Sequence, residues 1–208
     1  MLKEHWKELS AILIDLVVFS LEIYCLTNFL GYLIKGNPDI RFRYYTNISN
    51  LFMGLISLTD AIILIITLIQ RKRHFCKVFS IIKFVGISMT TLTFVVILLA
   101  APFEGFYKLY SGVKIITHLI VPLLAAFSYL FLSQDKKFEW RYSLLGVAPT
   151  IIYAIIYVLN VVIIENWPDI YSVNKNGIWY VFVLIAIVLG FILTQGLYFL
   201  KKRISKIY

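Results

Sequence analysis

Stretches of polar sequence are scarce in this chain, and none of those that separate its apolar runs is long enough to form a soluble domain. Cysteine is also rare. Cys25 lies within an apolar run and Cys76 lies in a basic gap, so a disulfide between them is not expected. No group of cysteine and histidine residues has the spacing of metal ligands. The sequence therefore predicts neither a disulfide framework nor a metal site, and we expect no cofactor.

Patterns that would indicate other architectures are absent as well. A membrane β-barrel needs segments of about ten residues with alternating polarity, whereas the apolar run at residues 61–66 is continuous. No small-residue cleavage pattern follows the first apolar run, so we interpret this run as an uncleaved helix and not as a signal peptide. No internal repeat or low-complexity tract is visible. A single membrane domain over residues 1–208 is the simplest interpretation.

The chain is instead rich in long apolar runs. Hydrophobic residues make up 61% of the sequence and the mean hydropathy is +0.86, whereas ordinary domains are about 45–50% apolar. A helix needs about 20 apolar residues to cross a bilayer, and six stretches meet this requirement: residues 9–33, 46–69, 78–99, 113–132, 144–164 and 178–200. The sequence predicts an all-α, polytopic protein of the cell membrane, built as a bundle of six transmembrane helices.

The basic residues predict the orientation of these helices, because Lys and Arg near membrane ends are retained in the cytoplasm. Of the 20 basic residues, 14 fall on the side that holds both termini, so we expect cytoplasmic N- and C-termini. These 14 are Lys3, Lys7, Arg71, Lys72, Arg73, Lys77, Lys83, Lys136, Lys137, Arg141, Lys201, Lys202, Arg203 and Lys206. Because they are spread over the gaps and not over one amphipathic face, a nucleic-acid partner is not predicted.

Polar side chains within the apolar runs are the candidates for function, since each is costly in hydrocarbon unless it faces the bundle interior. In the second run Thr46, Asn50, Ser57 and Asp60 stand at offsets of 4, 11 and 14, which places them on one helical stripe. The fourth run carries one ionisable residue at depth, His118. Supporting polar residues occur in the first and fifth runs: Asp15, Glu22, Tyr153, Tyr157 and Asn160.

Thr46 and His118 enter the membrane from the same side and lie at comparable depth. A threonine hydroxyl becomes a nucleophile when a nearby base removes its proton, and neutral imidazole does this near pH 7. Asn50, one turn below Thr46, could donate hydrogen bonds to an oxyanion. The alternative is a structural one, in which these polar groups bond to their own backbone or join helices together.

Two segments resemble a known family. The sequence RYYTNISNL at residues 43–51 and ITHLIVP at residues 116–122 are similar to the androgen-induced protein family, and APTIIY at residues 148–153 and NWP at 166–168 extend the likeness. Its members are six-helix membrane proteins, and the animal ones hydrolyse fatty acid esters of hydroxy fatty acids with a membrane threonine and histidine. The resemblance implies that Thr46 is the nucleophile and His118 its base, in a hydrolase of fatty-acyl esters.

Three function classes therefore stay open. The first is an intramembrane lipid-ester hydrolase, or an acyltransferase using the same residues, with Asn50, Ser57, Tyr153 and Tyr157 contacting a lipid substrate. The second is a small ion-coupled transporter built around Glu22 and Asp60, because acids at such depth often mark ion routes. The third is a purely structural role, and for Asp15 and Lys83 a structural ion pair is expected. No protein partner is predicted.

Overall fold

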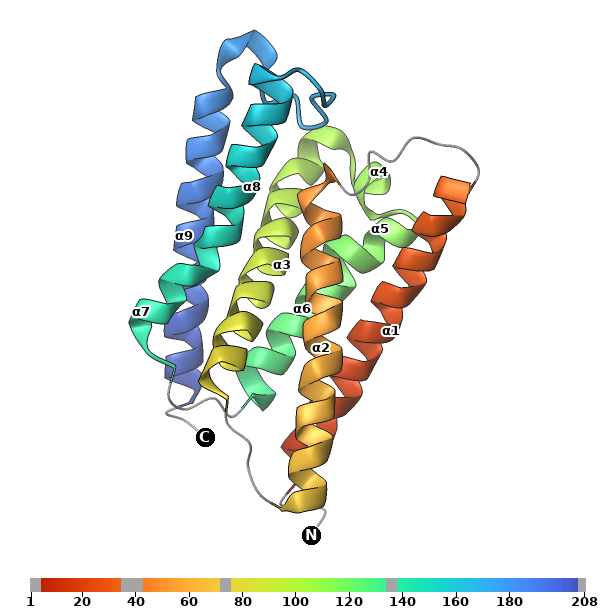
Figure 1. The fold of residues 1–208 in the computed structure, drawn as a ribbon, viewed down its shortest axis with the longest axis vertical. Helices are drawn as coiled ribbons and strands as arrows, with labels where there is room; N and C mark the ends of the chain where they lie inside the picture. Colours follow the sequence, from red (N-terminus) through yellow and green to blue (C-terminus); the bar gives the residue numbers. More distant parts are fainter. Residues whose placement is uncertain (1–4, 35–42, 72–75, 134–137, 206–208) are drawn as a thin grey trace.

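The computed structural model describes residues 5–34, 43–71, 76–133 and 138–205, and every regular element in these ranges is helical (Figure 1). Three long helices come first: α1 (Trp6–Ile34), α2 (Tyr45–Gln70) and α3 (Lys77–Glu104). Short elements follow: α4 (Phe106–Tyr110), α5 (Val113–Ile115), η2 (Ile116–Ile120), α6 (Val121–Phe127), η3 (Ser128–Leu132), α7 (Trp140–Ser143), η4 (Leu144–Val147), α8 (Ala148–Val158), η5 (Leu159–Ile163) and η6 (Lys175–Gly177). The last element is the long helix α9 (Trp179–Ile204).

Six of the resulting helical segments are long and apolar enough to cross a membrane, which confirms the predicted six-helix polytopic fold. They are Trp6–Asn28, Tyr45–Gln70, Lys77–Glu104, Val113–Leu132, Trp140–Ile163 and Trp179–Ile204. The outward faces carry exposed leucine, isoleucine and phenylalanine. Such a surface suits lipid as the surrounding solvent, because lipid tails are as apolar as these side chains.

Several spans extend further than the sequence predicted, the third and the fifth among them. The third runs on to Glu104 through Pro102, where a gap was expected. A proline removes one backbone N–H, but near a helix end this costs a single hydrogen bond, and the Gly105 N–H still reaches the carbonyl of Ala101 at 3.0 Å. The fifth begins at Trp140, because the short helix α7 continues through η4 into α8.

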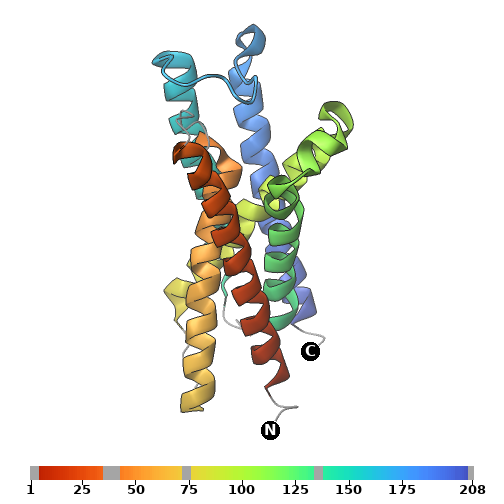
Figure 2. The same ribbon diagram turned by 90° about the vertical axis from the view of Figure 1, so that its right-hand side faces the viewer.

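The helices pack side by side as an elongated bundle, in which α1 and α2 are antiparallel neighbours in both views (Figures 1 and 2). Helix α1 begins and α9 ends at the lower end of Figure 1, so an even number of crossings returns the chain to its starting side. The core between the helices is formed by Val18, Met53, Phe84, Ile87, Val121 and Tyr129. Which end faces the cytoplasm stays a prediction, and several of the basic residues behind it lie outside the described residues: Lys3, Lys72, Arg73, Lys136, Lys137 and Lys206.

The fourth span, Val113–Leu132, contains two π-helical turns. The first, η2, precedes Pro122: the N–H of Val121 bonds to the carbonyl of Ile116, and the next carbonyl, that of Thr117, faces the proline nitrogen, which has no hydrogen to donate. Thr117 is therefore left with a carbonyl that must find a partner outside its own helix. At the lower end, the Lys201 ammonium on α9 donates to the carbonyls of the second π turn, at 2.7 Å from that of Tyr129.

Candidate functional site

His118 lies within the first π-helical turn of the fourth span and is 9% exposed. Its Nδ1 is 2.7 Å from the backbone carbonyl of Leu109, and the ring of Tyr110 stands edge-on to it with centroids 6.4 Å apart. A carbonyl only accepts hydrogen bonds, so Nδ1 carries the proton and Nε2 is the free acceptor of the neutral ring. This is the tautomer in which Nε2 can take a proton from a hydroxyl.

Asn50 connects α2 to the same π-helical turn. Its Nδ2 donates to the carbonyl of Thr117 at 3.0 Å and to the carbonyl of Thr46, one turn above, at 2.8 Å. The carbonyl that Pro122 leaves without a helical partner is thus satisfied from the neighbouring helix. Both amide hydrogens of Asn50 are used in this way, so its predicted role as a donor to an oxyanion would require one of these bonds to open.

Thr46 lies in the first turn of α2 and is half-buried. Its backbone carbonyl accepts a hydrogen bond from the Ser49 hydroxyl at 2.9 Å in addition to the bond from Asn50. Because Asn50 is one turn from Thr46 and bonds to the residue before His118, the two predicted catalytic residues flank the same contact between α2 and the fourth span. This contact lies toward the upper end of the bundle (Figure 1).

The predicted substrate-binding tyrosines of the fifth span hold a loop of the chain. The hydroxyl of Tyr153 donates to the carbonyl of Arg43, and that of Tyr157 donates to Asp169 Oδ1 at 2.9 Å. Asn160 contributes through its backbone, since its carbonyl accepts the N–H groups of residues 166 and 167 at 2.9 and 3.1 Å. Through these bonds Tyr157 and Asn160 hold the segment before α9 against the fifth span. Tyr153 contacts the residue two positions before the start of α2.

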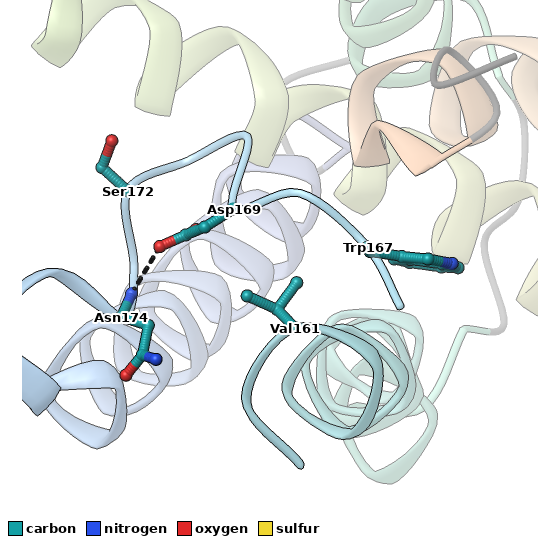
Figure 3. Close-up of a pocket in the computed structure, with 5 residues that line it drawn as sticks. All are labelled: Val161, Trp167, Asp169, Ser172 and Asn174. Atoms are coloured by element: carbon teal, nitrogen blue, oxygen red, sulfur yellow. Dashed lines mark hydrogen bonds between the residues drawn. The ribbon is translucent and has the colours of Figure 1, made fainter. Parts of the chain in front are cut away.

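An open hollow of about 360 Å³ lies beside this loop, lined by Val161, Trp167, Asp169, Ser172 and Asn174 (Figure 3). Figure 3 shows the Asp169 carboxylate turned toward the backbone N–H of Asn174, 2.7 Å from Oδ2. Its Oδ1 accepts from the Val173 N–H as well as from the tyrosine hydroxyl. The Asp169 carboxylate is thus engaged in hydrogen bonds that hold the loop. Neither Thr46 nor His118 lines the hollow.

The remaining predicted residues lie lower, where α1 and α2 meet. Glu22 packs against Gly54, where an added Cβ would come within 2.9 Å of the Glu22 Cβ. Asp60 forms a buried ion pair with Lys83 of α3. The structure thus gives Lys83 a direct partner, Asp60, that the predicted pair with Asp15 did not include, and the Asp15–Lys83 pair itself stays a prediction. The sequence could not reveal the contact between Asp60 and Lys83, because it does not show how α2 and α3 are rotated toward each other.

The sequence reasoning missed the partners of His118. Leu109 contributes only its backbone carbonyl, which no residue pattern encodes. Tyr110 was overlooked because it precedes the span, yet its hydroxyl is buried without a hydrogen-bond partner among the described residues. A signal that could have pointed to these backbone contacts is Pro122, four residues after His118, since a proline in a membrane helix frees backbone groups that neighbours must satisfy.

Comparison with known proteins adds no further assignment: no family model, no curated protein and no solved structure matches the chain.

Proposed function

We propose that this protein is an intramembrane hydrolase of fatty-acyl esters, in which Thr46 is the nucleophile and His118 the general base. The observation that carries the proposal is the 2.7 Å contact between His118 Nδ1 and the Leu109 carbonyl, which fixes the ring and leaves Nε2 as a proton acceptor. A base whose second nitrogen is held by another group is the arrangement that activates hydroxyl nucleophiles. The resemblance of residues 43–51 and 116–122 to the androgen-induced protein family supports the same pair.

The chemistry requires only these two side chains. The Thr46 hydroxyl attacks the ester carbonyl while Nε2 of His118 takes its proton, and the protonated ring then returns this proton to the departing alcohol. Water next attacks the acyl-threonine, again with His118 as base, and releases the fatty acid. If a second lipid hydroxyl takes the place of water, the same steps transfer the acyl group to that lipid.

An apolar substrate suits the surroundings of His118. The short helix α4, which supplies the Leu109 carbonyl, carries exposed aromatic side chains, with Phe106 and Tyr107 exposed to 59% and 87%. Aromatic rings of this kind favour the headgroup region of a bilayer. They would hold the site just below the membrane surface, where a lipid ester enters from the leaflet and water enters from outside.

The experiment that tests the proposal is covalent labelling of the purified protein with a fluorophosphonate probe. Thr46→Ala should abolish labelling, because it removes the nucleophile, and His118→Ala should lower the labelling rate by about 100-fold or more, because a general base contributes at least that factor. Thr59→Ala is the matched control, since Thr59 lies on the same helix and its hydroxyl bonds to its own backbone, at the carbonyl of Leu55. Labelling that survives Thr46→Ala would exclude this nucleophile.

A further inference from the structure

The first turn of α2, which carries Thr46, is capped from a distant part of the chain. The residue at the N-cap position, Tyr44, makes no side-chain hydrogen bond to this turn. The first N–H groups of a helix have no partner within the helix, so they need an acceptor from elsewhere. The N–H of Tyr45, directly before Thr46, donates to the hydroxyl of Tyr171 at 2.9 Å. The start of α2 is therefore bonded to the loop that precedes α9.

This loop, which joins η5 to α9 over residues 164–178, is held in shape by one carboxylate. Asp169 Oδ1 accepts from the Val173 N–H at 2.9 Å, and Oδ2 accepts from the Asn174 N–H at 2.7 Å (Figure 3). The same Oδ1 accepts from the Tyr157 hydroxyl of α8 at 2.9 Å, and that hydroxyl accepts from the Tyr171 N–H at 3.2 Å. A continuous set of hydrogen bonds thus runs from α8 through the loop to the residue that bonds α2.

Aromatic contacts hold the side chain of Tyr171 in the same place. Its ring stands edge-on to that of Tyr44, with centroids 6.0 Å apart, and lies 5.3 Å from the ring of Tyr157. The Tyr153 hydroxyl is 3.4 Å from the Tyr171 hydroxyl. Ring pairs at these separations are favourable contacts. Phenylalanine at position 171 would keep the ring contacts and remove the acceptor of the Tyr45 N–H.

The location of this bond matters because the proposed reaction needs the Thr46 hydroxyl at a fixed place relative to the ring of His118. The ring is held by the carbonyl of Leu109, and Asn50 joins α2 to the fourth span one turn below Thr46. Helix ends fray, so a bond one turn inside α2 does not by itself fix the end of the helix. The bond at the Tyr45 N–H acts at that end, on the other side of Thr46.

We propose that Tyr171 is a positioning residue for the reaction of Thr46, because its hydroxyl caps the first turn of α2 and thereby sets the place of the nucleophile relative to His118. This inference rests on the proposed function and adds the loop of residues 164–178 to its machinery. Tyr171 acts through the backbone of α2 and not by contact with the substrate. Tyr153 and Tyr157, predicted to bind substrate, then serve as supports of Tyr171.

The kinetics of fluorophosphonate labelling of the full-length protein in lipid nanodiscs test this role. Tyr171→Phe should lower the rate constant at saturating probe by about 10-fold, because a misplacement of about 1 Å costs up to about 100-fold. The fraction of protein that is finally labelled should stay at the wild-type value. A residue that only stabilises the fold would lower this fraction and leave the rate constant unchanged. Tyr180→Phe, the same change at a tyrosine of α9 that is 57% exposed, is the matched control and should label like the wild type.

Hydrogen–deuterium exchange of the same proteins measures the cap without any chemistry at Thr46. In Tyr171→Phe, the amides in the first turn of α2 should exchange about five-fold faster than in the wild type, the factor expected for the loss of one hydrogen bond. The amides in the middle of α2 should keep their wild-type rates, as should the whole of α2 in Tyr180→Phe.

Two results would overturn this proposal alone. The first is a wild-type exchange rate in the first turn of α2 in Tyr171→Phe, which would show that the hydroxyl does not cap the helix. The second is faster exchange together with an unchanged labelling rate constant, which would show that the cap does not position the nucleophile. A folded wild-type protein that takes no label at Thr46 would overturn the proposed function as well.

Discussion

The two polar regions of this bundle differ in how their hydrogen-bonding groups are satisfied. In the upper region, the amide hydrogens of Asn50, Nδ1 of His118 and the hydroxyl of Tyr157 have partners within the protein, whereas Asn50 Oδ1 and the Tyr110 hydroxyl have none among the described residues. In the lower region, oxygens of Asp15 and Glu22 have none among the described residues. Both regions are buried, so burial alone does not separate them.

The difference teaches how to interpret polar groups within a membrane protein. In the upper region, hydrogen bonds hold the ring of His118 and join α2 to the fourth span, which is the fixed geometry that the proposed pair of Thr46 and His118 requires. In the lower region, the buried groups are charged side chains, and the Asp60 carboxylate is held by the Lys83 ammonium. Burying charges is costly unless they are paired, so the lower region should contribute to stability through that pair.

The largest expected effect comes from removing the Lys83 ammonium from the lower region. Lys83→Met leaves the buried Asp60 carboxylate without this cation, and breaking a buried pair in this way costs about 3–5 kcal/mol. The midpoint of denaturant-induced unfolding in bicelles measures this loss. A Lys83→Met protein as stable as the wild type would show that water reaches Asp60 in spite of its burial. It would contradict the contrast between the two regions.

Close packing of α1 on α2 gives the next largest effect. Gly54→Ala places a methyl group 2.9 Å from the Cβ of Glu22, and overpacking of this kind costs about 1–3 kcal/mol. Gly196→Ala is the matched control in α9, since an added Cβ there meets nothing within 4 Å. We expect this control to be neutral or to stabilise by about 0.5–1 kcal/mol, because alanine suits a helix better than glycine. Equal stabilities for the two variants would contradict the packing.

Much of this architecture could be predicted from the sequence, because hydrophobic length directly encodes a membrane span. The six spans follow from that rule, and the polar stripe of α2 follows from the helical period of 3.6 residues. What could not be predicted is contact between helices: the Lys83–Asp60 pair, and the carbonyl of Leu109 on His118. Pairing of this kind depends on helix rotation and on backbone atoms, neither of which leaves a residue pattern.

Asn50→Leu tests the hydrogen bond between α2 and the fourth span in the upper region. The change removes the donor to the Thr117 carbonyl, and hydrogen bonds between membrane helices contribute about 0.6 kcal/mol on average and up to about 1.7 kcal/mol. We expect a stability loss in this range, together with slower fluorophosphonate labelling, because the turn that holds His118 loses its anchor. Labelling at the wild-type rate would show that this bond does not position the base.

The smallest effect is expected at the exposed ion pair of Lys77 and Glu139, 2.8 Å apart. The hydrogen bond from Lys77 holds the pKa of Glu139 below its usual range. A lowered carboxyl pKa stabilises the folded state above the unfolded-state value, about 4.3, and this contribution disappears as the pH falls through the folded-state value. Glu139→Gln should therefore shift the unfolding midpoint only slightly at pH 7, and by less as the pH is lowered toward about 3.

The most direct test of the division between the two regions is the position of the fluorophosphonate adduct, found by mass spectrometry of peptides from the labelled protein. We predict an adduct on Thr46 in the wild type and in Asp15→Asn, and an adduct that forms about 100-fold more slowly, or slower still, in His118→Ala. An adduct on any other residue, or an unmodified Thr46 in a folded wild-type protein, would contradict the account.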